Sequence, residues 1–456
     1  MRIVICKENF PSSRLKMKKI KLSDYIFSRA KSLAGIFRAM KNRNYRIFFI
    51  GQLISLTGTW MQQIALSWLV YRLTNSPFLL GMVGFVGLIP CFFITPVAGV
   101  IADRYDHRKM LVITQTLSMV QAVILSVLVL TNRINYVHVM ILSAFLGIVN
   151  AFDMTIRQAF TIEMIDRKED LSNAIALNSS LFNIARLVGP SIAGVLIAAA
   201  GEGICFVLNS VSYFAIIISL LVIKTKRRHV AQNGNSVFLD IKEGFRYAFG
   251  FIPIRSILLL LALVSLVGVP YQVLMPVFAK DVLHGGAHTL GFLSSMAGLG
   301  ALAGAIYLAM RISVIGLGRM IAWAAAIFGV GMIFFSFSRV LWLSMLMIFI
   351  SGFGAMVQMA SSNTVLQTIA DDDKRGRVMS FYTLSFIGTV PFGSLLAGSL
   401  ASKIGAPSTL FISGVCCIAG AVLFFKKLPR FREQIRPVYV RKGIIPEVAK
   451  GIQSTT

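Results

Sequence analysis

Charged residues are scarce in this 456-residue chain. Charged residues make up 14% of it, against about 25% in soluble domains. Only 18 residues are acidic, while 45 are Lys or Arg, and the hydrophobic content is 56%. A composition of this kind excludes an ordinary soluble enzyme or binding domain and indicates a chain that lies mostly in a membrane.

Motifs for chemistry are missing as well. The five cysteines, Cys6, Cys91, Cys205, Cys416 and Cys417, have neither metal spacing nor a disulfide pattern, so we expect them to be packing residues. The sequence has no G-x-x-x-x-G-K-[ST] loop, which leaves ATP hydrolysis without support. Because no nucleophile–base pair or metal cluster is apparent either, we predict neither an enzyme nor a bound cofactor or metal.

Long apolar runs are abundant instead. Twelve of them reach the roughly 20 residues that a membrane span needs, and each is predicted to be a helix because backbone groups in a bilayer must pair with one another. The longest polar interruption, residues 225–253, divides the runs six and six. The sequence therefore predicts an all-α integral membrane protein with 12 transmembrane helices in two pseudo-symmetric six-helix bundles.

The predicted organisation has five parts. A cytoplasmic basic tail with a helix along the membrane surface occupies residues 1–45, and the two bundles occupy 46–224 and 254–427. A cytoplasmic linker (225–253) joins the bundles, and a second basic tail (428–456) follows them.

Lys and Arg are distributed unevenly over the two sides of the predicted helices. The terminal segments and every second loop hold 39 of them, the other loops hold 5, and Arg186 alone lies within a span. This positive-inside pattern predicts a multi-pass protein of the cell inner (plasma) membrane with both termini in the cytoplasm. Orientation and attraction to anionic membrane lipids account for the net charge of +27, so nucleic acid is not an expected partner.

Two short stretches recur in the two halves. "GPSIAGVL" (189–196) aligns with "GSLLAGSL" (393–400), and "SPFLLG" (76–81) corresponds to "AHTLG" (287–291). Weak similarity between two six-helix halves is typical of transporters that bind a small-molecule substrate between their bundles, near the bilayer midplane. We expect such a substrate and a monomeric protein.

The stretch "GVIADRYDHRKML" (99–111) brings acids and bases together in a predicted cytoplasmic turn. A turn that only oriented the chain would need the bases but not Asp103. We therefore expect a gating latch, an ion-pair network that forms and breaks, which the i,i+4 pair Asp153 and Arg157 joins from a neighbouring helix. Gly99 is expected to allow a close helix approach. The predicted latch comprises Gly99, Asp103, Arg104, Arg108, Asp153 and Arg157.

Gly99, Asp103, Arg104, Arg108 and Lys109 resemble the G-x-x-x-D-R-x-G-R-K signature of the major facilitator superfamily. The stretches 42–81, 173–194 and 375–398 agree with this resemblance. It implies the major facilitator fold, and a role for Asp103, Arg104 and Arg108 in stabilising an outward-facing state.

Two positions depart from that signature. Asp106 replaces its glycine, and His107 stands where it usually has arginine. The aspartate variant is similar to the branch that holds enterobactin-type siderophore exporters and macrolide efflux pumps.

The fifth predicted helix contains both a proline and a charge. Pro190 removes a backbone hydrogen bond and Gly189 permits tight packing, so we expect a kink there; the G-P-x-x-x-G arrangement also resembles a signature of drug–proton antiporters. Arg186 lies near mid-depth, where a charge facing lipid costs about 2.5 kcal/mol or more. It is therefore expected to face a central cavity, where either an anionic substrate or a partner on another helix would pair with it.

Polar residues at helical spacing are predicted to line the same cavity, because lipid-facing amides would be costly. The candidates are Gln52, Thr59, Gln62, Gln63, Ser179, Asn183, Arg186, Tyr271, Gln272, Gln358 and Tyr382.

These observations predict a secondary transporter that exports a small organic molecule, such as a siderophore, macrolide or other drug, by alternating access. Protons are the expected coupling ion, with Asp153, Asp103 and Glu163 as the candidate carriers and Asp153 as the one to test; a passive or otherwise coupled carrier stays an alternative. Alternatives stay open: a lysophospholipid or nutrient transporter of the same fold, or a membrane sensor or scaffold that transports nothing.

Overall fold

The computed structural model describes residues 38–102, 104–165, 168–223, 245–311, 313–371 and 374–445. Over these ranges the chain consists of helices and short turns, without a strand. Residues 1–37 of the tail in which the surface helix is expected, and most of the linker expected at 225–253, lie outside the described residues, so both stay predictions.

Six long helices form the first half of the fold, after the short helix η1 (Arg38–Lys41). They are α2 (Arg43–Thr74), α3 (Pro77–Ala102), α4 (His107–Leu130), α5 (Tyr136–Glu163), α6 (Lys168–Ala200) and α7 (Glu202–Val222). Asn42, Asp106 and Asn135 precede three of these helices, and their side chains accept hydrogen bonds from first-turn N–H groups. Such caps satisfy donors that a helix start leaves unpaired.

The second half contains four continuous helices and two interrupted ones. The continuous helices are α11 (Ala287–Ala309), α12 (Leu317–Phe337), α13 (Leu341–Ile369) and α16 (Ala406–Arg441). One interrupted segment comprises α9 (Ile252–Leu263), η2 (Val264–Gly268), α10 (Tyr271–Val277) and η3 (Phe278–Val282), and the other comprises α14 (Arg375–Phe386) and α15 (Val390–Ile404). Both η2 and η3 are π-helical, a widening that frequently occurs at functional sites.

Among the described residues, 11 helical segments are long and apolar enough to cross a membrane. α2 is the twelfth long helix, and its 32 residues would extend about 48 Å at 1.5 Å per residue. Polar side chains lower its hydropathy, including the buried Gln52 and Gln62. Because α2 packs against α6 and α7, those polar groups face protein.

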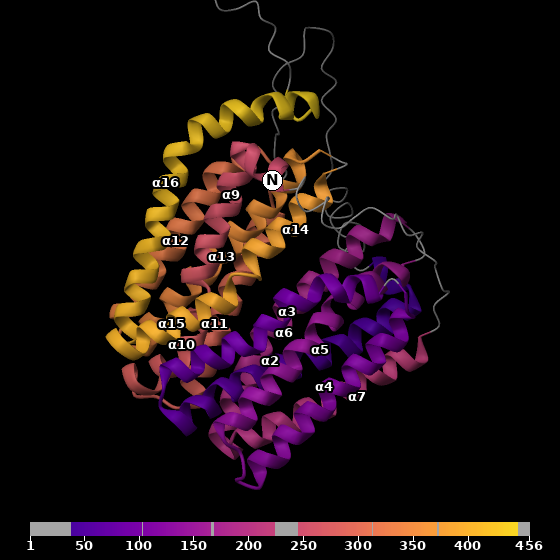
Figure 1. Ribbon diagram of the computed structural model, residues 1–456, viewed down its shortest axis with the longest axis vertical. Helices are drawn as coiled ribbons and strands as arrows, with labels where there is room; N and C mark the ends of the chain where they lie inside the picture. Colours follow the sequence, from indigo (N-terminus) through magenta and orange to yellow (C-terminus); the bar gives the residue numbers. More distant parts are fainter. Residues whose placement is uncertain are drawn as a thin grey trace, which may run out of the picture.

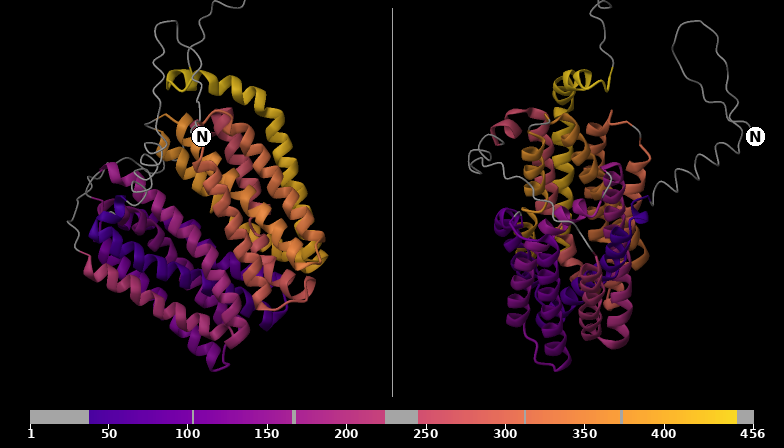
Figure 2. Two further views of the ribbon diagram at one scale, coloured as in Figure 1. Left: turned by 180° about the vertical axis from the view of Figure 1, so that it is seen from behind. Right: turned by 90° about the vertical axis from the view of Figure 1, so that its right-hand side faces the viewer.

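The two halves form two bundles that lean apart toward one end (Figures 1 and 2). We call the end where α7 ends, at Val222, the linker end, and the end where α2 ends, at Thr74, the far end. The bundles meet toward the far end, where α6 packs on α11 and α3 packs on α15.

The repeated stretches of the sequence form these two crossings. A Cβ added at Gly81 would lie 2.9 Å from Cα of Gly398, and one added at Gly194 would lie 2.9 Å from Cα of Gly291. Each crossing therefore pairs a glycine of one repeat with a glycine of the other, at matching positions of the two alignments. Glycine is needed because any side chain would overlap the facing backbone.

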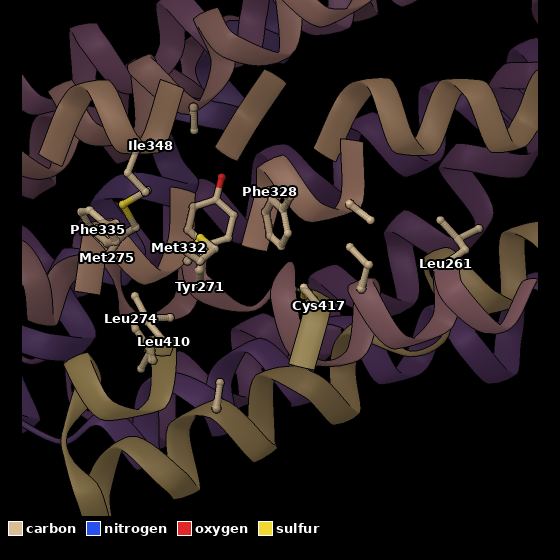
Figure 3. Close-up of a cluster of buried hydrophobic side chains, with 14 of the residues drawn as sticks. Leu261, Tyr271, Leu274, Met275, Phe328, Met332, Phe335, Ile348, Leu410 and Cys417 are labelled. Atoms are coloured by element: carbon tan, nitrogen blue, oxygen red, sulfur yellow. The ribbon is translucent and has the colours of Figure 1, made fainter. Parts of the chain in front are cut away.

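Close packing also organises the second bundle. The G-x-x-x-G pattern of Gly300 and Gly304 contacts α13, since added Cβ atoms would lie 2.0 Å and 2.9 Å from the carbonyl oxygens of Phe349 and Phe353. Figure 3 shows the neighbouring core, in which the aromatic ring of Tyr271 lies beside that of Phe328.

α16 continues beyond residue 427, where the sequence analysis places the start of a basic tail. Its last turns bury Leu428, Phe431, Ile435 and Tyr439, and Figure 1 shows the helix bending over the linker end. The apolar residues recur at steps of three and four among exposed bases, so a hydropathy window misses a helix that one-sided packing stabilises.

Candidate functional site

A cavity of about 320 Å³ lies between the two bundles, at the small end of the range for ligand sites. Residues of α2, α3, α5 and α6 form one wall, and residues of the segment 269–275, α11 and α15 form the other. Most of the lining is apolar. The polar lining residues are Thr59, Gln62, Gln63, Ser67, Ser143, Asn150, Arg186, Gln272, Ser294 and Ser394.

Arg186 occupies the middle of the 28-residue span Asn173–Ala200. Its side chain lines the cavity, and its guanidinium carbon lies 5.8 Å from the centre of the Trp60 ring. In the described ranges, no carboxylate lies within 4.0 Å of the guanidinium. The contact with the ring is a cation–π interaction, and the charge is left available to the cavity.

The residues after Arg186 explain how α6 presents it. An added Cβ at Gly189 would lie 2.6 Å from Cβ of Trp60, so α6 and α2 are in direct contact there. Pro190 lines the cavity and has no N–H to donate to the carbonyl of Arg186, four residues earlier. Across the interface, an added Cβ at Gly298 would lie 3.0 Å from that carbonyl oxygen. The kink expected at Gly189 and Pro190 stays a prediction.

Five of the predicted cavity residues line this cavity together: Thr59, Gln62, Gln63, Arg186 and Gln272. The Gln62 amide is also held inside its own bundle. Its Nε2 donates to Gln121 Oε1 at 3.0 Å, and its Oε1 accepts from Asn209 Nδ2 at 2.7 Å.

The other predicted cavity residues are not in the lining. Gln52, Tyr271, Gln358 and Tyr382 are buried among packed helices. Their positions differ from the expectation because helical spacing identifies a face that avoids lipid, and both a cavity and a packed neighbour satisfy that requirement.

Ser179 and Asn183 also lie outside the lining. The Ser179 hydroxyl donates to the carbonyl of Ile175, and Asn183 Nδ2 donates to the carbonyl of Ser179 at 2.9 Å. Both side chains therefore bond to the backbone of their own helix, α6.

Trp60 and Asn150 line the cavity but were not among the candidates from the sequence. Asn150 follows the apolar run "ILSAFLGIV" in α5, and a lone amide at membrane depth is a signal that would have identified it. Trp60 carried no comparable signal, because an aromatic residue in a span is more often part of the packing.

Of the predicted latch, Asp103 lies outside the described residues. Arg104 is exposed in the turn after α3. Arg108 instead binds the C-terminal end of α7, where its Nε donates to the carbonyl of Leu220 at 2.5 Å and its Nη2 donates to that of Leu221 at 2.6 Å. A cation at a helix C-terminus pairs with carbonyls that the helix leaves open and interacts favourably with the negative end of the helix dipole.

The close helix approach expected at Gly99 occurs elsewhere. An added Cβ at Gly99 would lie 3.9 Å from Thr155, which is ordinary contact. The tight crossing of α3 and α5 is at Gly87 and Gly147, where an added Cβ at Gly147 would lie 2.4 Å from the carbonyl oxygen of Gly87.

The two positions that depart from the superfamily signature have defined roles in this turn. Asp106 caps α4, accepting a hydrogen bond from the N–H of Lys109 at 3.1 Å. His107 Nδ1 lies 2.7 Å from Glu163 Oε1, which connects the start of α4 to the end of α5. Aspartate and glycine are both favourable N-cap residues, so Asp106 is compatible with the turn.

Asp153 is buried inside the first bundle rather than in the cavity wall. It pairs with Arg157 one turn later. The same carboxylate accepts hydrogen bonds from Thr114 at 3.0 Å and Gln115 at 2.6 Å, both on α4. A buried carboxylate with this many partners stabilises the contact of α4 with α5.

Polar contacts join the two bundles at the far end. The Tyr71 hydroxyl donates to Asp281, and Lys280 Nζ donates to Asn75 Oδ1 at 2.7 Å. Deeper in the interface, the hydroxyls of Ser191 and Ser295 are 2.6 Å apart. We call Tyr71, Asn75, Lys280 and Asp281 the far-end bridge.

Two six-helix bundles around a central cavity define the class of major facilitator transporters, as the resemblance in the turn at 99–111 implied. The match to a family model is more specific: residues 34–446 match the family described as transmembrane secretion effector. The chain belongs to this family of membrane transporters, and the predicted fold class is confirmed.

Characterised relatives align over most of the chain. The staphyloferrin A transporter of Staphylococcus aureus is 28% identical over 83% of this chain and 95% of that protein. The multidrug efflux pump Tap of Mycolicibacterium fortuitum is 27% identical over 82% and 93%. The enterobactin exporter EntS of Salmonella paratyphi A is 23% identical over 85% and 94%.

Solved structures support the fold. A bacterial homologue of the human lysosomal transporter Spinster, in an inward-facing and unoccupied conformation, matches with a TM-score of 0.68 at 14% identity, over 86% of this chain and 98% of that one. The nucleoside transporter NupG matches with a TM-score of 0.66 at 12% identity, over 84% and 99%.

Proposed function

We propose that this protein exports a small organic molecule, such as a siderophore, macrolide or other drug, across the plasma membrane by alternating access. The observation that carries the proposal is the cavity between the bundles, with Arg186 at mid-span. A site at a bundle interface is opened to either side by rocking one bundle against the other. Relatives named as a siderophore transporter, an exporter and a drug efflux pump support the direction.

The charge distribution supports an orientation. Of 45 Lys and Arg residues, 39 belong to the segments that the positive-inside rule assigns to the cytoplasm. The turn before α4 and the turn after α13 are described parts of these segments, and both lie at the linker end. The far end is then extracellular, and the far-end bridge closes it. The conformation is accordingly inward-facing, the state in which an exporter loads its substrate from the cytoplasm.

Proton antiport is the proposed energy source. In the described ranges the cavity lining includes no carboxylate, so we place the proton carrier outside the lining. Asp153 meets this requirement, since it is 4% exposed and its partners lie on α4 and α5.

Direction of transport tests the proposal against its alternatives. A pump-deficient bacterial strain that produces the protein should survive higher concentrations of a macrolide or a siderophore in a panel. Everted vesicles should then accumulate that compound when the interior is acidified. Uptake by intact cells instead would indicate a nutrient importer, and movement of lysophospholipid alone would indicate a lipid transporter.

A sensor or scaffold of the same fold predicts a different result. Its activity would not require a substrate, and the variant Arg186→Ala would keep it. Loss of transport in Arg186→Ala, with normal amounts of protein in the membrane, supports transport through the cavity.

A further inference from the structure

We infer that the transported molecule is an amphiphilic oxyanion, and that the Arg186 guanidinium binds its carboxylate or phosphate group while the aliphatic wall holds its apolar part. This inference rests on the proposed transport function and names the class of its substrate.

The charge of the cavity is the first argument. Among the described residues that line it, Arg186 is the one with a charged side chain. Other polar lining groups are hydroxyls and amides, which include Gln63, Asn150 and Gln272. A cationic substrate would meet a like charge in a medium of low dielectric constant, while an anionic one would meet an opposite charge.

The carboxylates that could neutralise Arg186 are engaged elsewhere. Asp153 pairs with Arg157 inside the first bundle, Glu202 with Arg72 at the far end, and Asp281 with Tyr71. The Trp60 ring stabilises the cation in part. Since an uncompensated charge at this depth is costly, a bound anion would remove a cost that the empty site carries.

The geometry of the guanidinium favours an oxyanion in particular. Its planar N–H groups match two oxygens of a carboxylate or phosphate, and such charge-assisted pairs are about twice as strong as neutral hydrogen bonds. Leu66, Val83, Leu146, Val273 and Met275 belong to the same lining, and they supply apolar surface for the rest of the molecule. A fully hydrophilic anion would leave that surface unused.

Binding by probes that share a naphthyl ring and differ in their polar group tests the inference. The full-length protein in lipid nanodiscs would be titrated with tritiated 1-naphthylacetate and, in a separate series, with tritiated 1-naphthyl phosphate, and the unlabelled neutral 1-naphthylacetamide would compete in each series. We expect at least one of the two anions to bind about 10-fold or more tightly than the amide, the effect of one charge-assisted hydrogen-bond pair. The better of the two anions identifies a carboxylate or a phosphate as the recognised group.

Variants assign the preference to one side chain. Arg186→Gln should abolish the preference for the anion, and Arg186→Lys should retain part of it. Arg133→Gln is the matched control, because Arg133 is exposed in the loop between α4 and α5. Equal binding of amide and anions, no binding of either anion, or an unchanged preference in Arg186→Gln would each overturn the inference. If Arg186→Gln does not fold, the wild-type comparison and Arg186→Lys still decide.

Transport is measured separately from binding. Protection of the pump-deficient strain against neutral or cationic compounds only would overturn the anionic substrate and leave export in place. Binding of the anions without efflux of any compound would leave the anion site in place and overturn export.

Discussion

Single side chains in the first bundle combine stability with a candidate role in coupling. Asp153 carries three side-chain contacts in a buried position, and Asp106 satisfies the first turn of α4. The first is a buried carboxylate that could exchange a proton, while the second caps the start of a helix. Substitution separates these two kinds of residue.

Asp153→Asn should abolish proton-driven transport in proteoliposomes and leave substrate binding intact, because an amide fills the same space but cannot take up and release a proton. The rate would be measured after an imposed pH jump. Asp371→Asn is the control, since Asp371 pairs with the exposed Arg441 at the linker end. If Asp153→Asn transports at the wild-type rate after the pH jump, Asp153 is excluded as the coupling residue.

Asp106→Ala should lower the free energy of unfolding by about 1 kcal/mol, the usual value of an N-cap. Asp106→Asn and Asp106→Gly should lower it by only a few tenths of a kcal/mol, because both residues are accepted at this position. Chemical unfolding in detergent micelles, followed by circular dichroism, measures the three variants. Equal losses for alanine and asparagine would show that the cap contributes nothing.

At the scale of helices, the fold depends on two crossings that have no room for a side chain. Gly81 with Gly398 and Gly194 with Gly291 place backbone on backbone, and the facing carbonyls of Ser394 and Pro190 complete each contact. These crossings join the bundles toward the far end, so widening either of them should separate α3 from α15 or α6 from α11.

Gly291→Val should shift the population toward a conformation open at the far end, because the new side chain would overlap Cα of Gly194 and the carbonyl of Pro190. Spin labels at Ser76 in the first bundle and His284 in the second, both at that end, should show longer distances by double electron–electron resonance. Gly376→Val is the control, since nothing lies within 4 Å of an added Cβ there. An unchanged distance distribution would contradict the role of this crossing.

For the whole molecule, the far-end bridge is a polar closure that a rocking motion must break. It consists of Tyr71 and Asn75 from the first bundle and of Lys280 and Asp281 from the second, with the Lys280 ammonium also 5.5 Å from the Tyr71 ring. Each contact of this kind is worth on the order of 1 kcal/mol, which is enough to bias two states of similar free energy.

Tyr71→Phe should open the far end more often, because it removes the hydroxyl that donates to Asp281. In a cysteine-free background, Ser294→Cys places a thiol in the cavity wall. An impermeant maleimide added outside intact cells should modify it about fivefold faster in Tyr71→Phe, from the loss of about 1 kcal/mol. Arg72→Gln, which breaks a contact within the first bundle, should leave the rate near that of wild type. Equal rates in both variants would contradict the closure.

The sequence by itself determined the class of fold, because a membrane requires long apolar helices and an excess of bases on one side, and both are visible in composition. It also identified Arg186, since a charge at mid-span is costly unless it faces the interior of the protein or a water-filled cavity. The glycine repeats at 189–196 and 393–400 were visible too. The contact of the first with 287–291 and of the second with 76–81 was not.

Tertiary structure decided which polar faces line the cavity and which are packed. Thr59 and Gln63 line it while Gln52, on the same helix, is buried, because a polar face is kept from lipid equally well by a cavity and by a packed neighbour. It also decided the partners of charge: Arg108 binds the end of α7 and His107 contacts Glu163. Spacing along one helix predicts a face, but the neighbour of that face comes from segments more than 50 residues away in these contacts, which only packing of the whole chain brings together.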